Sequence, residues 1–337
     1  MSVILGFIVA VFIYPGLLVA FGAAWALGWV RAATRGALRG ALTPAPLGEL
    51  RGWRTLFGRE SVTPLGVQPI AVALATLLAL LCPLLALILL PVPGNPLAGS
   101  LGLTGDLAAE GALLLGLPLA RVFLGWATPS PFTRIAADRD ARLLAGAILP
   151  LVFAFTASAE ALETLGLTFL PARQLSFYPG LAVALAGVAF ACALPVLARL
   201  TPLHEGDPDA ETLGSELSEI SGRDLAAFRV GEALQLAACA ALLTLAFVLP
   251  LLTGMIANLT TSFTHLFKSA NLGAGVAQAL VLLVGVLLVA AGLGVWEGIY
   301  TPRRASGERP PLTWWFGIPL LLGMAALVAA AWATRGG

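Results

Sequence analysis

The chain has 337 residues, of which 59% are hydrophobic and only 11% are charged. Soluble domains contain about 25% charged residues, so this composition excludes a water-soluble fold and indicates an integral membrane protein. The formal net charge of +1 gives no reason to expect nucleic-acid binding.

Apolar segments recur along the whole sequence, each long enough for a membrane-spanning helix of about 20 residues. We therefore predict an all-α, polytopic membrane protein that forms a single integral membrane domain over residues 1–337. The first segment has no basic start and no early cleavage site, so we expect a retained span rather than a signal peptide. The eight predicted spans lie near 3–29, 68–91, 106–126, 141–165, 177–199, 228–252, 272–295 and 312–334.

The loop after the first span has its own pattern. Arg31, Arg35 and Arg39 are spaced by four, which places them on one face of a helix. The stretch ELRGWRTLFGRE, residues 49–60, mixes aromatic, aliphatic and basic side chains. It predicts an amphipathic segment at the membrane surface, which covers a cavity from the cytoplasmic side.

Basic residues set the orientation of the spans. Most of the 19 Lys and Arg lie in or beside the four loops at 30–67, 127–140, 200–227 and 296–311. The positive-inside rule makes these loops cytoplasmic and places both termini on the outer side. We expect a bacterial or archaeal cytoplasmic membrane.

Acidic residues within or beside the spans are costly in a bilayer and are candidates for function. Arg229 and Glu232 are three apart and are predicted to pair, and Glu297 precedes Arg303 and Arg304. One hypothesis is a buried proton relay between the helices. The other is a set of solvated charges that cap helix ends. The relay candidates are Glu232, Glu297, Asp140, Glu219, Glu216, Arg229 and Arg139.

Four further acids lie near the outer ends of the spans, where we expect an interfacial position. They are Asp106, Glu110, Glu160 and Glu163.

Metal ligands are sparse. Cys82, Cys192 and Cys239 lie far apart inside apolar segments, and His204 and His265 fall in different loops. This spacing argues against a zinc, haem or iron–sulfur site and against a disulfide framework, so we expect no metal and no cofactor in this chain.

Four loop motifs appear in a recognisable order: LFGRE, SPFTRIAADRDAR, ELSEISGRDLAAFRVGEALQ and WEGIYTPRR. In these motifs the chain resembles the H-type membrane subunit family of NADH-quinone oxidoreductase, respiratory complex I. It resembles more closely the matching membrane subunit of group 4 membrane-bound [NiFe] hydrogenases and formate hydrogenlyases. The resemblance covers most of the chain, and its specificity lies in the loops.

The family motifs match at several positions. Arg59-Glu60 stands at a family Lys-Glu pair, Ser130-Pro131-Phe132 is intact before Arg139-Asp140, and Glu219-Ile220-Ser221-Gly222 lacks the family Tyr. Gly231-Glu232 and Glu297 stand at family Glu positions. The family usually has Glu before Pro150 in the fourth span, whereas this chain has Leu149.

The resemblance implies a non-catalytic membrane anchor and coupling subunit of an oxidoreductase complex. Such a subunit links electron transfer in a cytoplasmic iron–sulfur arm to proton or sodium translocation. The implied partners are a hydrogenase-like large subunit, an iron–sulfur small subunit and antiporter-like membrane subunits. Iron–sulfur clusters and a NiFe centre would belong to those partners, and quinone binding stays open. The residues implied to dock the arm are Arg59, Glu60, Arg223, Asp224, Arg303 and Arg304.

Three alternatives remain at this point. The first is the H-type membrane component of a quinone-reducing complex I relative. The second is a stand-alone secondary transporter, although no repeat relates 1–165 to 166–337. The third is a structural anchor without pumping, which Leu149 keeps open.

Overall fold

The computed structural model describes most of the chain. For residues 270–275, 277, 300–305, 312–315 and 335 it describes the backbone alone. The described residues are 8–9, 11–13, 16–63, 66–92, 95, 105–167, 175, 177–200, 217, 219–252, 270–305 and 312–335.

Eight of the described helices are long and apolar enough to cross a membrane, so the predicted all-α fold is confirmed. In α8 the helix widens into a π-helical turn, Thr244–Val248, before the short helix α9, Leu249–Leu251. The eight are α2 (Leu17–Leu38), α4 (Pro69–Leu89), α5 (Leu107–Ala127), α6 (Pro131–Leu162), α7 (Phe177–Leu197), α8 (Gly222–Leu243), α11 (Ala270–Ala305) and α12 (Leu312–Arg335).

Several helices extend beyond the predicted spans. Helix α2 continues past residue 29 to Leu38, and α6 begins at Pro131 rather than at 141. Helix α8 begins at Gly222 rather than at 228, and α11 reaches Ala305 rather than 295. The added turns carry most of the charged motif residues, because hydropathy marks the membrane core and not the ends of the helices.

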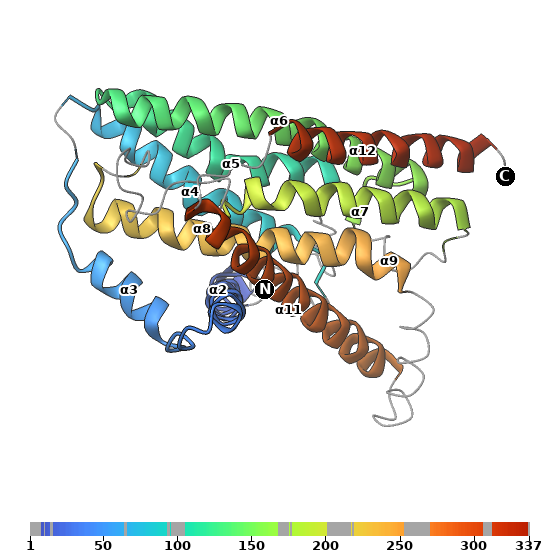
Figure 1. The fold of residues 1–337 in the computed structure, drawn as a ribbon. Helices are drawn as coiled ribbons and strands as arrows, with labels where there is room; N and C mark the ends of the chain where they lie inside the picture. The colour runs from blue at the N-terminus through green and yellow to red at the C-terminus, as the bar shows by residue number, and fades with distance from the viewer. Residues whose placement is uncertain are drawn as a thin grey trace.

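Helix α8 lies at the centre of the bundle and is buried over most of its length. Figure 1 shows α4 to α8 and α12 running nearly side by side, whereas α2 and α11 lie at a steep angle to them. Helices α6, α7 and α12 pack on one another, and α2 packs on α11. The helices in contact with α8 are α2, α3, α4, α5, α7 and α11.

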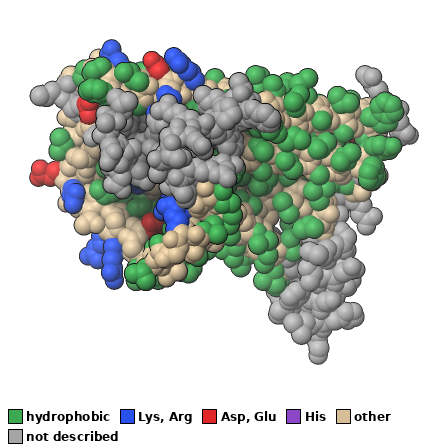
Figure 2. All heavy atoms as spheres, viewed as in Figure 1, with side chains coloured by type: hydrophobic (Ala, Val, Ile, Leu, Met, Phe, Trp, Pro, Cys, Tyr) green, Lys and Arg blue, Asp and Glu red, His purple; other side chains and the backbone are tan. Residues whose placement is uncertain are grey.

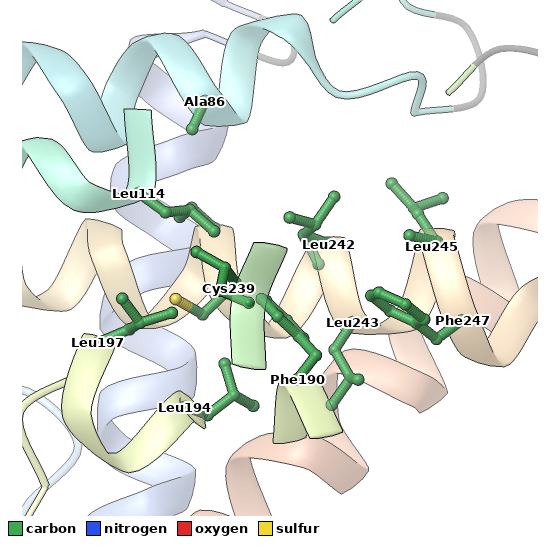
Figure 3. Packing of buried hydrophobic residues seen from close by; sticks show 14 of the residues in the cluster. Ala86, Leu114, Phe190, Leu194, Leu197, Cys239, Leu242, Leu243, Leu245 and Phe247 are labelled. Atoms are coloured by element: carbon green, nitrogen blue, oxygen red, sulfur yellow. The ribbon is translucent and has the colours of Figure 1, made fainter. Parts of the chain in front are cut away.

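The core of the bundle is aromatic and aliphatic. Phe190 and Phe247 stack with their ring centroids 5.4 Å apart, and Phe155 lies 5.5 Å from Phe190. Figure 3 shows Phe190 and Phe247 beside Leu243, with Cys239 directed among Leu194 and its neighbours. Aromatic pairs of this kind add about 0.5–1.5 kcal/mol each to the burial of their area.

The predicted amphipathic segment is helix α3, Gly48–Phe57. Trp25 Nε1 donates to the Pro46 carbonyl at 2.6 Å and Trp29 Nε1 to the Pro44 carbonyl at 3.0 Å. These bonds hold the connecting loop against α2, so α3 turns back over the bundle. Trp53 is buried on the inner side of α3, and the helix packs on α8.

Charged side chains gather at one end of the molecule. In Figure 2 Lys, Arg, Asp and Glu cluster at the end of the view where α3 lies, and hydrophobic side chains predominate on the described surface toward the opposite end. We call this the charged end. A polar end and an apolar body fit a protein whose body lies in lipid.

Candidate functional site: a charged cavity beneath helix α3

A cavity of about 330 Å³ opens between α3 and the bundle at the charged end. Its walls come from α2, α3, α5, α8, α11 and the end of α7. Five arginines and three glutamates line it, together with Trp53 and small or aliphatic residues. The charged lining residues are Arg31, Arg35, Glu49, Arg121, Arg199, Arg229, Glu232 and Glu297.

Glu232 lies between two arginines on the wall formed by α5 and α8. Its Oε1 pairs with Arg121 Nη1 and its Oε2 with Arg229 Nη1, the latter at 3.4 Å. The Arg121 side chain is only 3% exposed. A buried cation of this kind persists because a carboxylate balances its charge.

Glu297 lies on the opposite wall, where α11 crosses α2. Its Oε2 is 3.5 Å from Arg35 Nη1 and 3.8 Å from Arg31 Nε, and Arg39 Nη2 donates to the Glu297 carbonyl at 3.3 Å. The crossing is close because of Gly294 and Gly298. A Cβ at Gly294 would collide with the Thr34 hydroxyl, and one at Gly298 would lie 2.7 Å from a methyl of Leu38.

Asp140 and Arg199 form a third pair, which joins α6 to the end of α7. Arg199 Nη1 donates to Asp140 Oδ2 at 2.5 Å. The Arg199 side chain is 7% exposed and the Asp140 side chain 2% exposed, so the pair lies almost wholly inside the protein. Arg199 also lines the cavity, and the third pair therefore extends the charged network toward α6.

Glu49 completes the cavity from helix α3. Burial raises the pKa of this carboxyl above its ordinary value, and the nearby charges of Arg31 and Arg35 only partly oppose that effect. Its Oε2 is buried and makes no hydrogen bond with any described residue. The carboxyl lies against Gly28 of α2, where a Cβ would be 2.5 Å from Oε2.

The Glu49→Gln variant should change how stability depends on pH. Above the ordinary pKa of 4.5 Glu49 is ionised in the unfolded chain, whereas the folded protein keeps its proton up to the raised pKa. Folding then binds a proton, so Glu49 makes stability fall as pH rises through that window. We expect the melting temperature of Glu49→Gln, relative to wild type, to rise across the window and then level off. A constant difference at all pH values would contradict this prediction.

The described residues contain no group of three His, Cys, Asp or Glu side chains placed to hold a metal ion. The cavity offers guanidinium groups and carboxylates instead. Such a set can hold, pass or reorient charge, and it can bind an anionic or polar group.

Comparison with known proteins decides the family. The family model described as NADH dehydrogenase matches residues 50–329, which is most of the chain. The chain belongs to the NADH dehydrogenase family. It is a complex I-like membrane subunit, as the loop motifs predicted.

A solved structure shares the fold of this NADH dehydrogenase family chain. It is a chain of a membrane-bound sulfane sulfur reductase, described as an archaeal respiratory membrane complex. The TM-score is 0.69 at 18% sequence identity, and the match covers 98% of this chain and 100% of the other. A search of the curated proteins found no match.

Two loop motifs of this family member, predicted separately, lie together at the charged end. The backbone of Gly222 packs on the Glu60 carbonyl, and the Ser61 hydroxyl donates to Asp224 Oδ2. Gly222 has φ of 67°, a conformation that favours glycine. Arg59, Glu60 and Arg223 are exposed around this contact. We call the contact between residues 59–61 and 222–224 the loop junction.

Replacing Gly222 with alanine should disrupt the loop junction. The new Cβ would require a left-handed backbone and would collide with the Glu60 carbonyl. Strain of this kind costs about 1–3 kcal/mol before the collision is counted. We expect faster proteolysis between residues 57 and 66 in Gly222→Ala than in wild type. Gly52→Ala is a matched control, since nothing lies within 4 Å of a Cβ there. Equal cleavage rates for Gly222→Ala and wild type would refute the junction as a constraint.

Of the predicted relay residues, Glu232, Glu297 and Arg229 line the cavity, and Asp140 pairs with the lining residue Arg199. The expected Arg229–Glu232 pair is present. Arg139 lies partly buried on α6, and Glu219 lies in the turn before α8. Glu216 lies outside the described residues. Arg303 and Arg304, which were expected to dock the arm, lie on the last turn of α11, where only the backbone is described. Whether the group relays protons stays a prediction.

Sequence reasoning misses five of the eight charged residues that line the cavity, namely Arg31, Arg35, Glu49, Arg121 and Arg199. Glu297 pairs with Arg31 and Arg35 from the first helix, whose arginines the sequence presents chiefly as signals of topology. Arg121 stands out in the sequence only by its place near the end of a span, and Glu49 is not among the predicted site residues. The usable signals are the four-residue spacing of the arginines and the presence of a cation inside an apolar span.

The structure adds to the description of two further positions. Glu110, one of the predicted interfacial acids, is only 1% exposed and therefore lies inside the protein rather than in contact with solvent. The absent carboxylate at Leu149 does not belong to the cavity, because Leu149 is 54% exposed on the outer surface of α6 while Pro150 is buried.

Proposed function

We propose that this chain is the membrane anchor and coupling subunit of a complex I-like, energy-converting oxidoreductase of the hydrogenase type. The observation that carries the proposal is the charged cavity beneath α3. It gathers three ion-pair groups, centred on Glu232, Glu297 and Asp140, at the end of the bundle where the loop junction lies.

The ion pairs tie together the helices that form the cavity. Glu232 links α5 with α8, Glu297 links α11 with α2, and Asp140 links α6 with the end of α7. Each buried charge depends on its partner, so a change of charge at one pair alters the balance at the others. A reaction in a docked arm that adds or removes charge at the cavity would thereby bias proton occupancy along the network.

The loop junction and α3 form the surface on which the arm would dock. Arg59, Glu60 and Arg223 are exposed there, and Asp224 is held by Ser61. Their mixed charges suit a polar interface with a hydrogenase-like large subunit and an iron–sulfur small subunit. Antiporter-like membrane subunits would contact the apolar sides of the bundle.

This assignment also fixes an orientation. Since most arginines lie at the charged end, that end would face the cytoplasm and both termini the outer side of a bacterial or archaeal membrane. The redox centres, iron–sulfur clusters and, in a hydrogenase, a NiFe centre, would lie in the partners. This chain would supply attachment and charge coupling rather than catalysis.

Purification of the intact assembly tests the proposal. A tagged chain is extracted from its native membranes in mild detergent, and the eluate is analysed by mass spectrometry with iron and nickel assays. We expect large and small hydrogenase-like subunits together with iron. Nickel would indicate a hydrogenase, and iron without nickel together with quinone reduction would indicate a complex I relative. A chain that elutes alone and free of metal, under conditions that keep known complexes whole, would overturn the proposal and favour a stand-alone transporter.

A further inference from the structure

Glu110 is a buried carboxylate that the charged cavity does not use. It lies in the first turn of α5, eleven residues before Arg121, so about 16 Å of helix separates it from the cavity. Its exposed fraction is 1%, and neither carboxylate oxygen has a hydrogen-bond partner among the described residues. An isolated ionised carboxylate is very costly in such a place, so the site accommodates the protonated form.

The surroundings of Glu110 explain its burial. A Cβ at Gly105 would lie 2.7 Å from Glu110 Oε1 and 3.3 Å from the Leu89 side chain. The absence of a side chain at Gly105 therefore leaves the room that the carboxyl occupies. Asp106, one turn earlier, is exposed and caps the helix by accepting from the Ala109 N–H at 2.6 Å. An acid in contact with solvent thus lies next to the buried acid.

A second polar group with an unsatisfied atom lies between Glu110 and the cavity. Gln235 on α8 is 0% exposed, and its Nε2 donates to the Leu114 carbonyl at 2.6 Å. Its Oε1 has no hydrogen-bond partner among the described residues. Leu114 is one turn from Glu110 on α5, and Gln235 is one turn from Glu232 on α8. Polar groups therefore follow one another along the α5–α8 contact from the cavity as far as the Leu114 carbonyl, which is one turn of α5 from Glu110.

We propose that Glu110 is a proton-exchange site at the end of the bundle opposite the cavity, connected through Gln235 to the Glu232–Arg121 pair. The O–H bond of Glu110 breaks as its proton passes to Asp106 or to solvent at the exposed start of α5. The carboxylate takes a new proton along the α5–α8 contact, where Gln235 Oε1 accepts a hydrogen bond from the carrier, a water molecule or hydronium ion. This inference rests on the proposed coupling role, which it extends to the far side of the chain.

Infrared difference spectroscopy on the assembled complex tests proton exchange without any turnover. We expect a carbonyl band of a protonated carboxyl group that shifts on transfer to D₂O and is lost in Glu110→Gln. Glu160→Gln, which removes an exposed acid of α6 near the same end, should keep the band. Absence of a Glu110 band would show that the group is ionised, and a band that does not shift in D₂O would show a sealed structural carboxyl. Either outcome would overturn the proposal.

Proton release measured in vesicles tests the connection. We expect Glu110→Gln and Gln235→Leu to lose release on the far side while the complex stays assembled, and Glu110→Asp to restore part of it. Wild-type release in Glu110→Gln would overturn the proposal. If Glu232→Gln loses proton release and Glu110→Gln does not, the coupling role is supported and the route through Glu110 is excluded. Wild-type release in Glu232→Gln, with an exchanging Glu110 band, would instead contradict the coupling role and the connection together.

Discussion

Replacing Arg199 with leucine is expected to lower the free energy of unfolding by about 3–5 kcal/mol, because the change leaves a charge without its buried partner. Asp140 is 2% exposed, so water cannot replace the guanidinium group. The loss should be visible as a large decrease in the melting temperature of the purified protein in detergent.

Two variants separate the ion pair from general damage at this place. Arg142→Leu removes an exposed arginine from the same helix as Asp140 and should melt within a few degrees of wild type. In Asp140→Leu/Arg199→Leu both charges are absent, so much of the lost stability should return. A single Arg199→Leu variant as stable as wild type would show that the pair contributes nothing.

The Glu232→Gln and Glu297→Gln variants should lose coupled ion transport while electron transfer to a soluble acceptor continues. A positioned proton-transfer group contributes about 10²–10⁴-fold to the rate of a proton step, so we expect a decrease of at least about 100-fold in transport. Glutamine keeps the size and a hydrogen-bonding oxygen but cannot carry the proton. The measurement is proton or sodium uptake per electron in sealed vesicles.

A matched control for transport is Glu163→Gln, which removes an exposed acid at the far end of α6. It should transport at the wild-type ratio. If both cavity variants also transport at the wild-type ratio, the carboxylates serve only to hold the helices together, and the chain is a structural anchor.

Hydropathy predicted the existence of all eight long helices because each must present about 20 apolar residues to lipid. It misplaced their ends, since the charged turns of α6, α8 and α11 lie outside that apolar length. Pairs within one helix could be predicted, because residues three or four apart lie on the same face, as Arg229 and Glu232 do. Arg121 and Glu232 are 111 residues apart, and Arg35 and Glu297 are 262 apart, so no local spacing predicts their contact.

Glu110 shows a different limit of sequence reasoning. Its place at the start of a span suggested contact with water, which is the usual position for an acid beside an apolar segment. Gly105 leaves the room that the carboxyl occupies, and Leu89 comes to lie beside Gly105 only after the chain has folded back. Burial at a helix start depends on what covers that end, and hydropathy carries no such information.

The Leu149 side chain points away from the bundle, which decides what a different residue at this position would contact. A glutamate before this proline, which the family resemblance leads one to expect, would project from the side of α6 and not into the charged cavity. Lipid cannot solvate such a group, so a glutamate there would need a hydrogen-bond donor or a cation from a neighbouring protein. Leucine has no such requirement, so this side of α6 can lie against lipid or against an apolar surface. The substitution therefore concerns the lipid-facing side of α6 and leaves the charge balance of the cavity unchanged.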